Sequence, residues 1–150
     1  MRTLDQWFDE YAVSHQNPTN KLLHYICVPA IYFSIIGLLM SVKINFLQLN
    51  LPILENLAFV ILLFVLFFYF IISVGMAFKM AFFSALCVVL NFMIGQYLNL
   101  FVFSISIFII AWIGQFYGHK IEGKKPSFLK DLQFLMIGPA WVIENLFGKK

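Results

Sequence analysis

Long apolar runs divide this chain, and short stretches with charged or amide side chains separate them. The runs cover about residues 25–42, 56–75, 80–97 and 100–118. A helix needs roughly 20 mostly apolar residues to cross the hydrocarbon of a bilayer. The pattern therefore predicts an all-α, multi-pass membrane helical bundle with about four transmembrane helices, formed as a single membrane domain over residues 1–150.

Shorter helices are expected at both ends of the chain, at the membrane interface. Leu4, Phe8 and Tyr11 share one helical face near the N-terminus, while acidic side chains take the other faces. Residues 128–147 are predicted to form an amphipathic helix on the membrane surface, which Pro139 must bend or break. A fifth or re-entrant span over the same residues is the alternative interpretation.

The positive charges are distributed unevenly along the chain. With four spans, both termini lie on one side of the membrane, and that side holds every Lys and Arg except Lys43. Because cytoplasmic loops are enriched in these residues, the termini are predicted to be cytoplasmic. The location would be a bacterial inner membrane or, in a eukaryote, the endoplasmic reticulum.

The composition supports an integral membrane protein. Hydrophobic residues make up 62% of the chain and charged residues 11%, whereas soluble domains carry about 25% charged residues. The net charge of +3 is typical of membrane topology, so no nucleic-acid partner is expected. Cys27 and Cys87 lie in apolar runs and are not placed for a disulfide. The N-terminus lacks the apolar core of a signal peptide.

Residues 112–126 cross from an apolar run into a basic one. Read as a helix, this stretch places Trp112, Gln115, His119 and Glu122 on one face. The column therefore presents an aromatic ring, an amide, an imidazole and a carboxylate where a membrane helix leaves the bilayer. Such a set of groups is a candidate site.

All three histidines of the chain are expected at one level. His15 and His24 precede the first span, and Asn20 shares a face with His24. The predicted topology brings both histidines to the side of the membrane where His119 lies, so we predict that the three imidazoles hold a metal. Two or three histidines plus one carboxylate are typical of non-haem Fe(II) oxygenases. Glu122 would be the carboxylate ligand or would instead orient a ligand histidine.

Further groups could contact a substrate near this metal. Lys120, with Lys124 and Lys125, could attract a carboxylate, although a basic cluster at this place is also ordinary membrane topology. Gln115 and Asn20 are candidates for supporting hydrogen bonds. The chain has no G-x-S-x-G motif and no glycine-rich phosphate loop, and it has too few histidines for the di-iron desaturases.

These motifs resemble a known family. The chain is similar to the fungal endoplasmic-reticulum 2-hydroxy fatty acid dioxygenase of phytosphingosine degradation (fatty acid α-oxidation) and to its small bacterial relatives. The resemblance is carried by Tyr11-x-x-x-His15, Asn17-Pro18-x-Asn20-x-x-x-His24, Val28-Pro29, Trp112-x-x-Gln115-Phe116-x-Gly118-His119, Glu122-Gly123 and Pro126.

The resemblance implies an Fe(II)-dependent membrane enzyme that uses O2 to shorten a 2-hydroxy fatty acid by one carbon. Its metal ligands would be His15, His24 and His119. The candidate catalytic side chains are Glu122, Gln115, Asn20 and Lys120. Two other classes stay open: a non-enzymatic membrane scaffold or lipid-binding protein, and a metal or small-solute carrier. Oligomeric state is left open.

Overall fold

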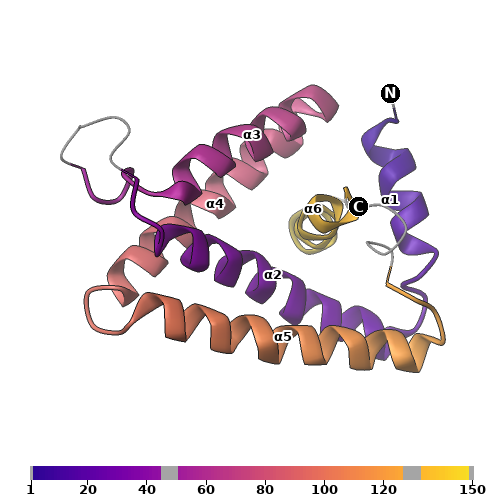
Figure 1. Ribbon diagram of the computed structural model, residues 1–150. Coiled ribbons are helices and arrows are strands. Elements are labelled where there is room, and N and C mark those ends of the chain that lie inside the picture. Colours follow the sequence, from indigo (N-terminus) through magenta and orange to yellow (C-terminus); the bar gives the residue numbers. More distant parts are fainter. Residues whose placement is uncertain (1, 45–50, 127–132, 149–150) are drawn as a thin grey trace. The chain divides into compact units, whose positions relative to one another are not determined.

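The computed structural model describes residues 2–44, 51–126 and 133–148, and its regular elements there are all helices (Figure 1). This confirms the predicted all-α bundle. The helices are α1 (Leu4–Ala12), α2 (Pro18–Met40), α3 (Leu57–Ile72), α4 (Val74–Ile94), α5 (Leu100–Glu122) and α6 (Phe134–Phe147).

Three of these helices, α2, α4 and α5, are long and apolar enough to cross a membrane. Helix α3 is almost wholly apolar but has only 16 residues, so the expected count of four spans stays a prediction. The predicted loop between the second and third runs is much shorter than expected. Ser73 ends α3, and its hydroxyl accepts a hydrogen bond from the Met76 N–H to cap α4. Lys79, which falls between the predicted runs 56–75 and 80–97, lies inside α4.

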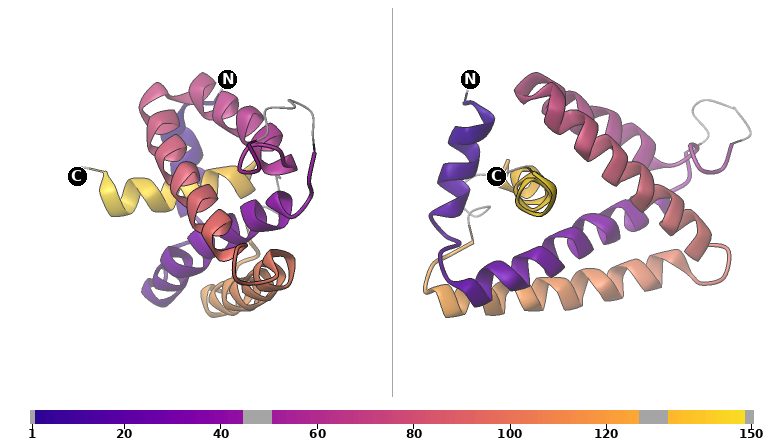
Figure 2. Two further views of the ribbon diagram at one scale, coloured as in Figure 1. Left: turned by 90° about the vertical axis from the view of Figure 1, so that its left-hand side faces the viewer. Right: turned by 180° about the vertical axis from the view of Figure 1, so that it is seen from behind.

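The chain forms two compact units, which are described separately. Unit 1 comprises residues 1–31 and 109–150, and unit 2 comprises residues 32–108. In unit 2, α3 and α4 run side by side as a helical hairpin (Figure 2). Apolar side chains from α2, α3 and α4 form the buried core of this unit: Ile36, Met40, Ala58 and Cys87.

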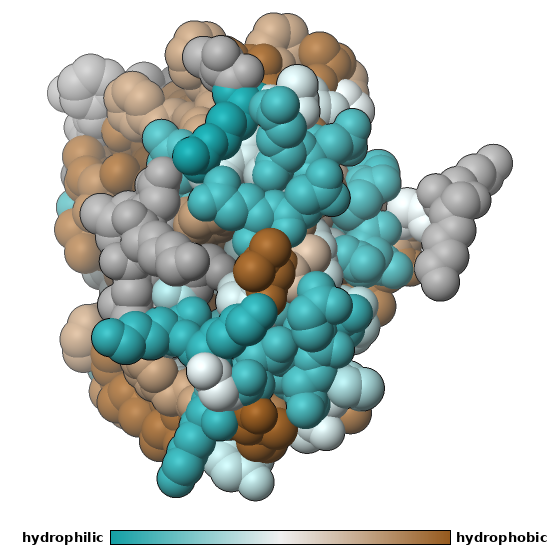
Figure 3. Space-filling view, turned by 90° about the vertical axis from the view of Figure 1, so that its right-hand side faces the viewer, coloured by the Kyte–Doolittle hydropathy of each residue, from teal (hydrophilic) through white to brown (hydrophobic). Residues whose placement is uncertain are grey.

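Unit 1 contains α1, the beginning of α2, the end of α5, and α6. Thr3 starts α1 with a capping box, in which its hydroxyl accepts from the Gln6 N–H and the Gln6 side chain accepts from the Thr3 N–H. Trp7 and Tyr11 form the buried face of α1, and Trp7 packs edge-on against Phe134 of α6 with ring centroids 5.3 Å apart. Polar side chains gather on the face shown in Figure 3, where α1 and the ends of α2 and α5 lie.

Helix α6 differs from the amphipathic surface helix expected from the sequence. Its residues from Ile137 to Ile143 are all buried, whereas an amphipathic helix buries one stripe. Of the two expected effects of Pro139, a break does not occur, since α6 continues through it, and a bend stays a prediction. The expected start at residue 128 lies outside the described residues. Burial on every side makes residues 137–143 of α6 part of a buried core.

A polar junction joins three helices inside unit 2. The Asn91 side chain on α4 donates to the carbonyls of Phe33 (3.1 Å) and Cys87 (2.9 Å). Gly37 on α2 lies directly against the Asn91 and Ser104 side chains, where a Cβ atom would overlap both. Gly37 therefore permits the close approach of α2 to α4 and α5 at this level.

We expect Gly37→Ala to destabilise the protein by roughly 1–3 kcal/mol, because the new methyl group overpacks this junction. Gly75→Ala is the matched control, since the nearest atom to its added Cβ is 4.0 Å away. The free energy of unfolding would be measured by denaturant titration in mixed micelles, followed by far-ultraviolet circular dichroism. Equal stabilities of the two variants would contradict the packing role of Gly37.

Candidate metal centre

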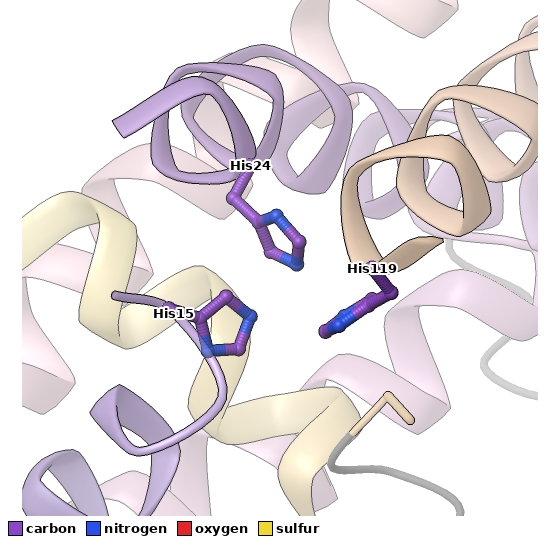
Figure 4. A group of neighbouring side chains, drawn as sticks. All are labelled: His15, His24 and His119. Carbon is purple, nitrogen blue, oxygen red and sulfur yellow. The ribbon is translucent and has the colours of Figure 1, made fainter. Parts of the chain in front are cut away.

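The three histidines of the chain converge in unit 1 (Figure 4). His15 follows α1, His24 lies in the second turn of α2, and His119 lies in the last turn of α5. One nitrogen from each ring can be chosen so that the three lie within 4.8 Å of one another, and all three residues are buried. The structure thus brings together the histidines that the sequence placed at one level.

Backbone carbonyls set the protonation of two of the rings. Nδ1 of His15 lies 2.6 Å from the Tyr11 carbonyl oxygen, and Nδ1 of His24 lies 2.9 Å from that of Asn20. A carbonyl oxygen only accepts, so each Nδ1 carries the proton and each Nε2 keeps a lone pair. This arrangement of a held Nδ1–H and an available Nε2 is typical of metal-ligating histidines.

The unsatisfied nitrogens of this cluster fit a metal ion. Among the described residues, His15 Nε2 and His119 Nδ1 are buried with no hydrogen-bond partner, and leaving a buried polar atom unpaired is costly. Burial lowers the pKa of His15 to about 4, so this ring is neutral at pH 7, as a ligand must be. Three neutral imidazoles suit Fe, Zn, Cu or Ni.

Aromatic rings cover one side of His15. Tyr11 stacks on it with ring centroids 4.1 Å apart, and Trp141 of α6 lies 5.6 Å away. Burial raises the pKa of the Tyr11 phenol far above its usual range, so this group stays a neutral phenol. Trp141 is buried beside the histidines. Trp141 reaches His15 because of the position of α6, and the hydropathy pattern did not predict that position.

Glu122 and Asn20, two of the candidate catalytic residues, bond to each other. The Glu122 carboxylate accepts from the backbone N–H groups of Gln16 (2.9 Å) and Asn17 (2.8 Å) and from the Asn20 side chain (3.1 Å). The Asn20 amide also donates to the Ser14 carbonyl. Neither side chain makes a hydrogen bond to an imidazole among the described residues. Both therefore join chain segments around the histidines.

The other two candidates differ in exposure. Gln115 is buried one helical turn before His119, whereas Lys120 is exposed immediately after it. Lys124, part of the expected basic cluster, donates to the Val13 carbonyl at 2.6 Å. Lys120 is thus the cation adjacent in sequence to the third histidine, and Lys124 connects the segment after α5 to the segment before His15.

A pair of glycines that the sequence interpretation missed brings α5 close to α2. A Cβ atom at Gly114 would meet Cys27 Sγ at 2.6 Å, and one at Gly118 would overlap Asn20 Oδ1. The signal was present as Gly114-x-x-x-Gly118, a spacing that places two small residues on one face for close helix packing. This contact sets the approach of the helices that carry His24 and His119.

Comparison with known proteins assigns this chain to a family. The family model described as 2-hydroxy-palmitic acid dioxygenase Mpo1-like matches residues 1–150. The chain belongs to this family. Searches of curated proteins and of solved structures found no match. The Mpo1-like match agrees with the resemblance seen in the histidine motifs, and it covers all three histidines of the buried cluster.

We expect His15→Ala, His24→Ala and His119→Ala each to lose most of the metal that copurifies with the protein, because each removes one of three converging nitrogens. Metal content would be measured by elemental analysis after anaerobic purification in detergent without chelators. Gln96→Ala, at an exposed position in unit 2, serves as the control and should keep its metal. Full occupancy in all three histidine variants would exclude this cluster as the binding site.

Proposed function

We propose that the protein is an Fe(II)-dependent dioxygenase that oxidatively decarboxylates a 2-hydroxy fatty acid to the fatty acid one carbon shorter. The observation that carries the proposal is the buried cluster of His15, His24 and His119. Its support is the match, over residues 1–150, to a family named for a 2-hydroxy-palmitic acid dioxygenase.

The stoichiometry of this reaction suits a small site. R-CH(OH)-COOH and O2 give R-COOH, CO2 and H2O, with every atom accounted for. The substrate supplies all four electrons that O2 takes up, so no outside reductant is needed. Iron, when bound, would supply the redox chemistry that allows O2 to react with the substrate.

The protein groups in this proposal hold the ligands and keep water away. His15, His24 and His119 are the metal ligands, and the carbonyls of Tyr11 and Asn20 keep two of them in the ligating tautomer. The rings of Tyr11 and Trp141 cover His15 and exclude solvent from that side. A fixed, dry set of ligands requires little rearrangement when the metal binds.

In this proposal, the substrate binds where the polar and apolar surfaces of unit 1 meet. Lys120 offers a cation for the substrate carboxylate, and Gln115 offers an amide on the face of His119. Exposed apolar side chains flank these positions on α2 and α5: Leu22, Ile26, Ile113, Phe116 and Tyr117. We propose that the acyl tail lies along this apolar surface. In this proposal, the metal centre and both termini lie on the cytoplasmic side of the membrane.

The proposed activity would be tested with the purified protein in lipid nanodiscs, loaded anaerobically with Fe(II). On addition of 2-hydroxypalmitate and O2, we expect pentadecanoic acid and CO2, with one O2 consumed for each acid formed. Palmitate and 3-hydroxypalmitate are the controls and should not be consumed, since neither carries a hydroxyl group beside the carboxylate.

The His24→Ala variant should be inactive in the same assay, because it lacks one ligand. Consumption of O2 without a shortened acid would contradict the decarboxylation. Stoichiometric zinc with no O2 uptake at any Fe(II) concentration would overturn the oxygenase assignment and favour a scaffold or lipid-binding role.

A further inference from the structure

The Glu122 carboxylate connects the three chain segments that carry the histidines. We propose that Glu122 is a positioning residue that assembles the metal centre from outside the ligand set, so that its loss weakens metal binding while the ligands stay the same. This inference rests on the metal binding in the proposed function, but it does not depend on which reaction the metal supports.

The first link runs from α5 to the segment after His15. Glu122 Oε1 accepts from the backbone N–H of Gln16, the residue that directly follows His15, at 2.9 Å. Glu122 Oε2 accepts from the backbone N–H of Asn17 at 2.8 Å. These backbone groups have no helical partner, since α2 begins only at Pro18. The carboxylate therefore fixes the course of the chain between His15 and α2.

The second link runs to His24 through Asn20. The Asn20 amide donates to Glu122 Oε2 at 3.1 Å and to the Ser14 carbonyl at 3.2 Å. The backbone carbonyl of the same residue accepts the Nδ1–H of His24. Asn20 thereby links the Glu122 carboxylate to Ser14, the residue before His15, and to the ring of His24.

The third link is the helix that carries Glu122 itself. His119 lies three residues earlier in α5, so the two side chains leave the same end of the helix. A negative charge beside the beginning of α2 is also favourable, because the helix dipole is positive there. One side chain thus holds the ligand-bearing end of α5 against the segments that carry the other two histidines.

These contacts argue against Glu122 as a ligand. Its two oxygens already accept three N–H groups. Direct coordination would draw the carboxylate away from the bonds that hold the His15 segment in place, since only one of its roughly four acceptor sites is left. Glutamine at this position offers one acceptor oxygen instead of two, so Glu122→Gln removes part of the contact without removing bulk.

The test uses full-length protein in detergent and cobalt(II) alone as a spectroscopic probe. We expect Glu122→Gln and Glu122→Ala to weaken cobalt affinity about 10–100-fold, as loss of a supporting contact does at metal sites. At saturating cobalt, the visible absorption spectrum should match that of the wild type, since the three imidazoles are unchanged. Asp9→Asn removes one charge at an exposed site on α1 and should bind cobalt like the wild type.

A second readout needs no metal. In the metal-free protein, hydrogen exchange at the backbone N–H groups of Gln16 and Asn17 should be faster in Glu122→Gln than in Asp9→Asn. Glu122→Asp, which keeps both oxygens on a shorter side chain, should recover part of the affinity.

The outcomes separate the possibilities. A changed cobalt spectrum at saturation would identify Glu122 as a ligand and overturn the proposal. Unchanged affinity, even with lower stability, would reduce Glu122 to an ordinary structural contact. If the wild type binds cobalt and iron but does not oxidise 2-hydroxy acids, the proposed function fails while the role of Glu122 is still decided by the binding data.

Discussion

The histidine cluster is defined by three buried imidazole rings that lie close together, and among the described residues His15 Nε2 and His119 Nδ1 have no hydrogen-bond partner. His15 and His24 both present Nε2 as an acceptor, because carbonyl oxygens hold their Nδ1 protons. Two acceptors cannot hydrogen-bond to each other, so the cluster gains nothing from its own proximity. Burial without a partner costs free energy. A metal cation that accepts these lone pairs would remove this cost. The contacts around the histidines hold the rings in the positions that such a cation requires.

Much of the helical arrangement can be predicted from hydropathy alone. Runs of apolar residues predicted the bundle, and the uneven distribution of Lys and Arg suggested which ends of the helices lie together. The convergence of His15, His24 and His119 followed from that topology. The exact ends of helices were harder to predict, since Ser73 serves both as the last cap of α3 and the first cap of α4. Such a one-residue connection leaves no polar loop for a hydropathy pattern to reveal.

The surroundings of the centre could not be predicted in the same way. Glu122 was visible at helical spacing from His119, but two of its three partners are backbone groups of Gln16 and Asn17, and backbone groups carry no sequence signal. Trp141 and its neighbours in α6, from Ile137 to Ile143, are buried by tertiary packing that local patterns do not specify. By contrast, Gly114 and Gly118 did carry a readable signal, because close helix contact requires small side chains at four-residue spacing.

The contact between Gln16 and Glu122 joins positions 106 residues apart, which has a consequence for biosynthesis. A ribosome adds about 5–20 residues per second, so the second half of the centre follows the first by roughly 5–20 s. During that interval His15 and His24 have been synthesised, but His119 has not. Under the proposed function, a metal could therefore be held by all three histidines only after translation has delivered the end of α5, and a truncated product would carry two histidines but no complete centre.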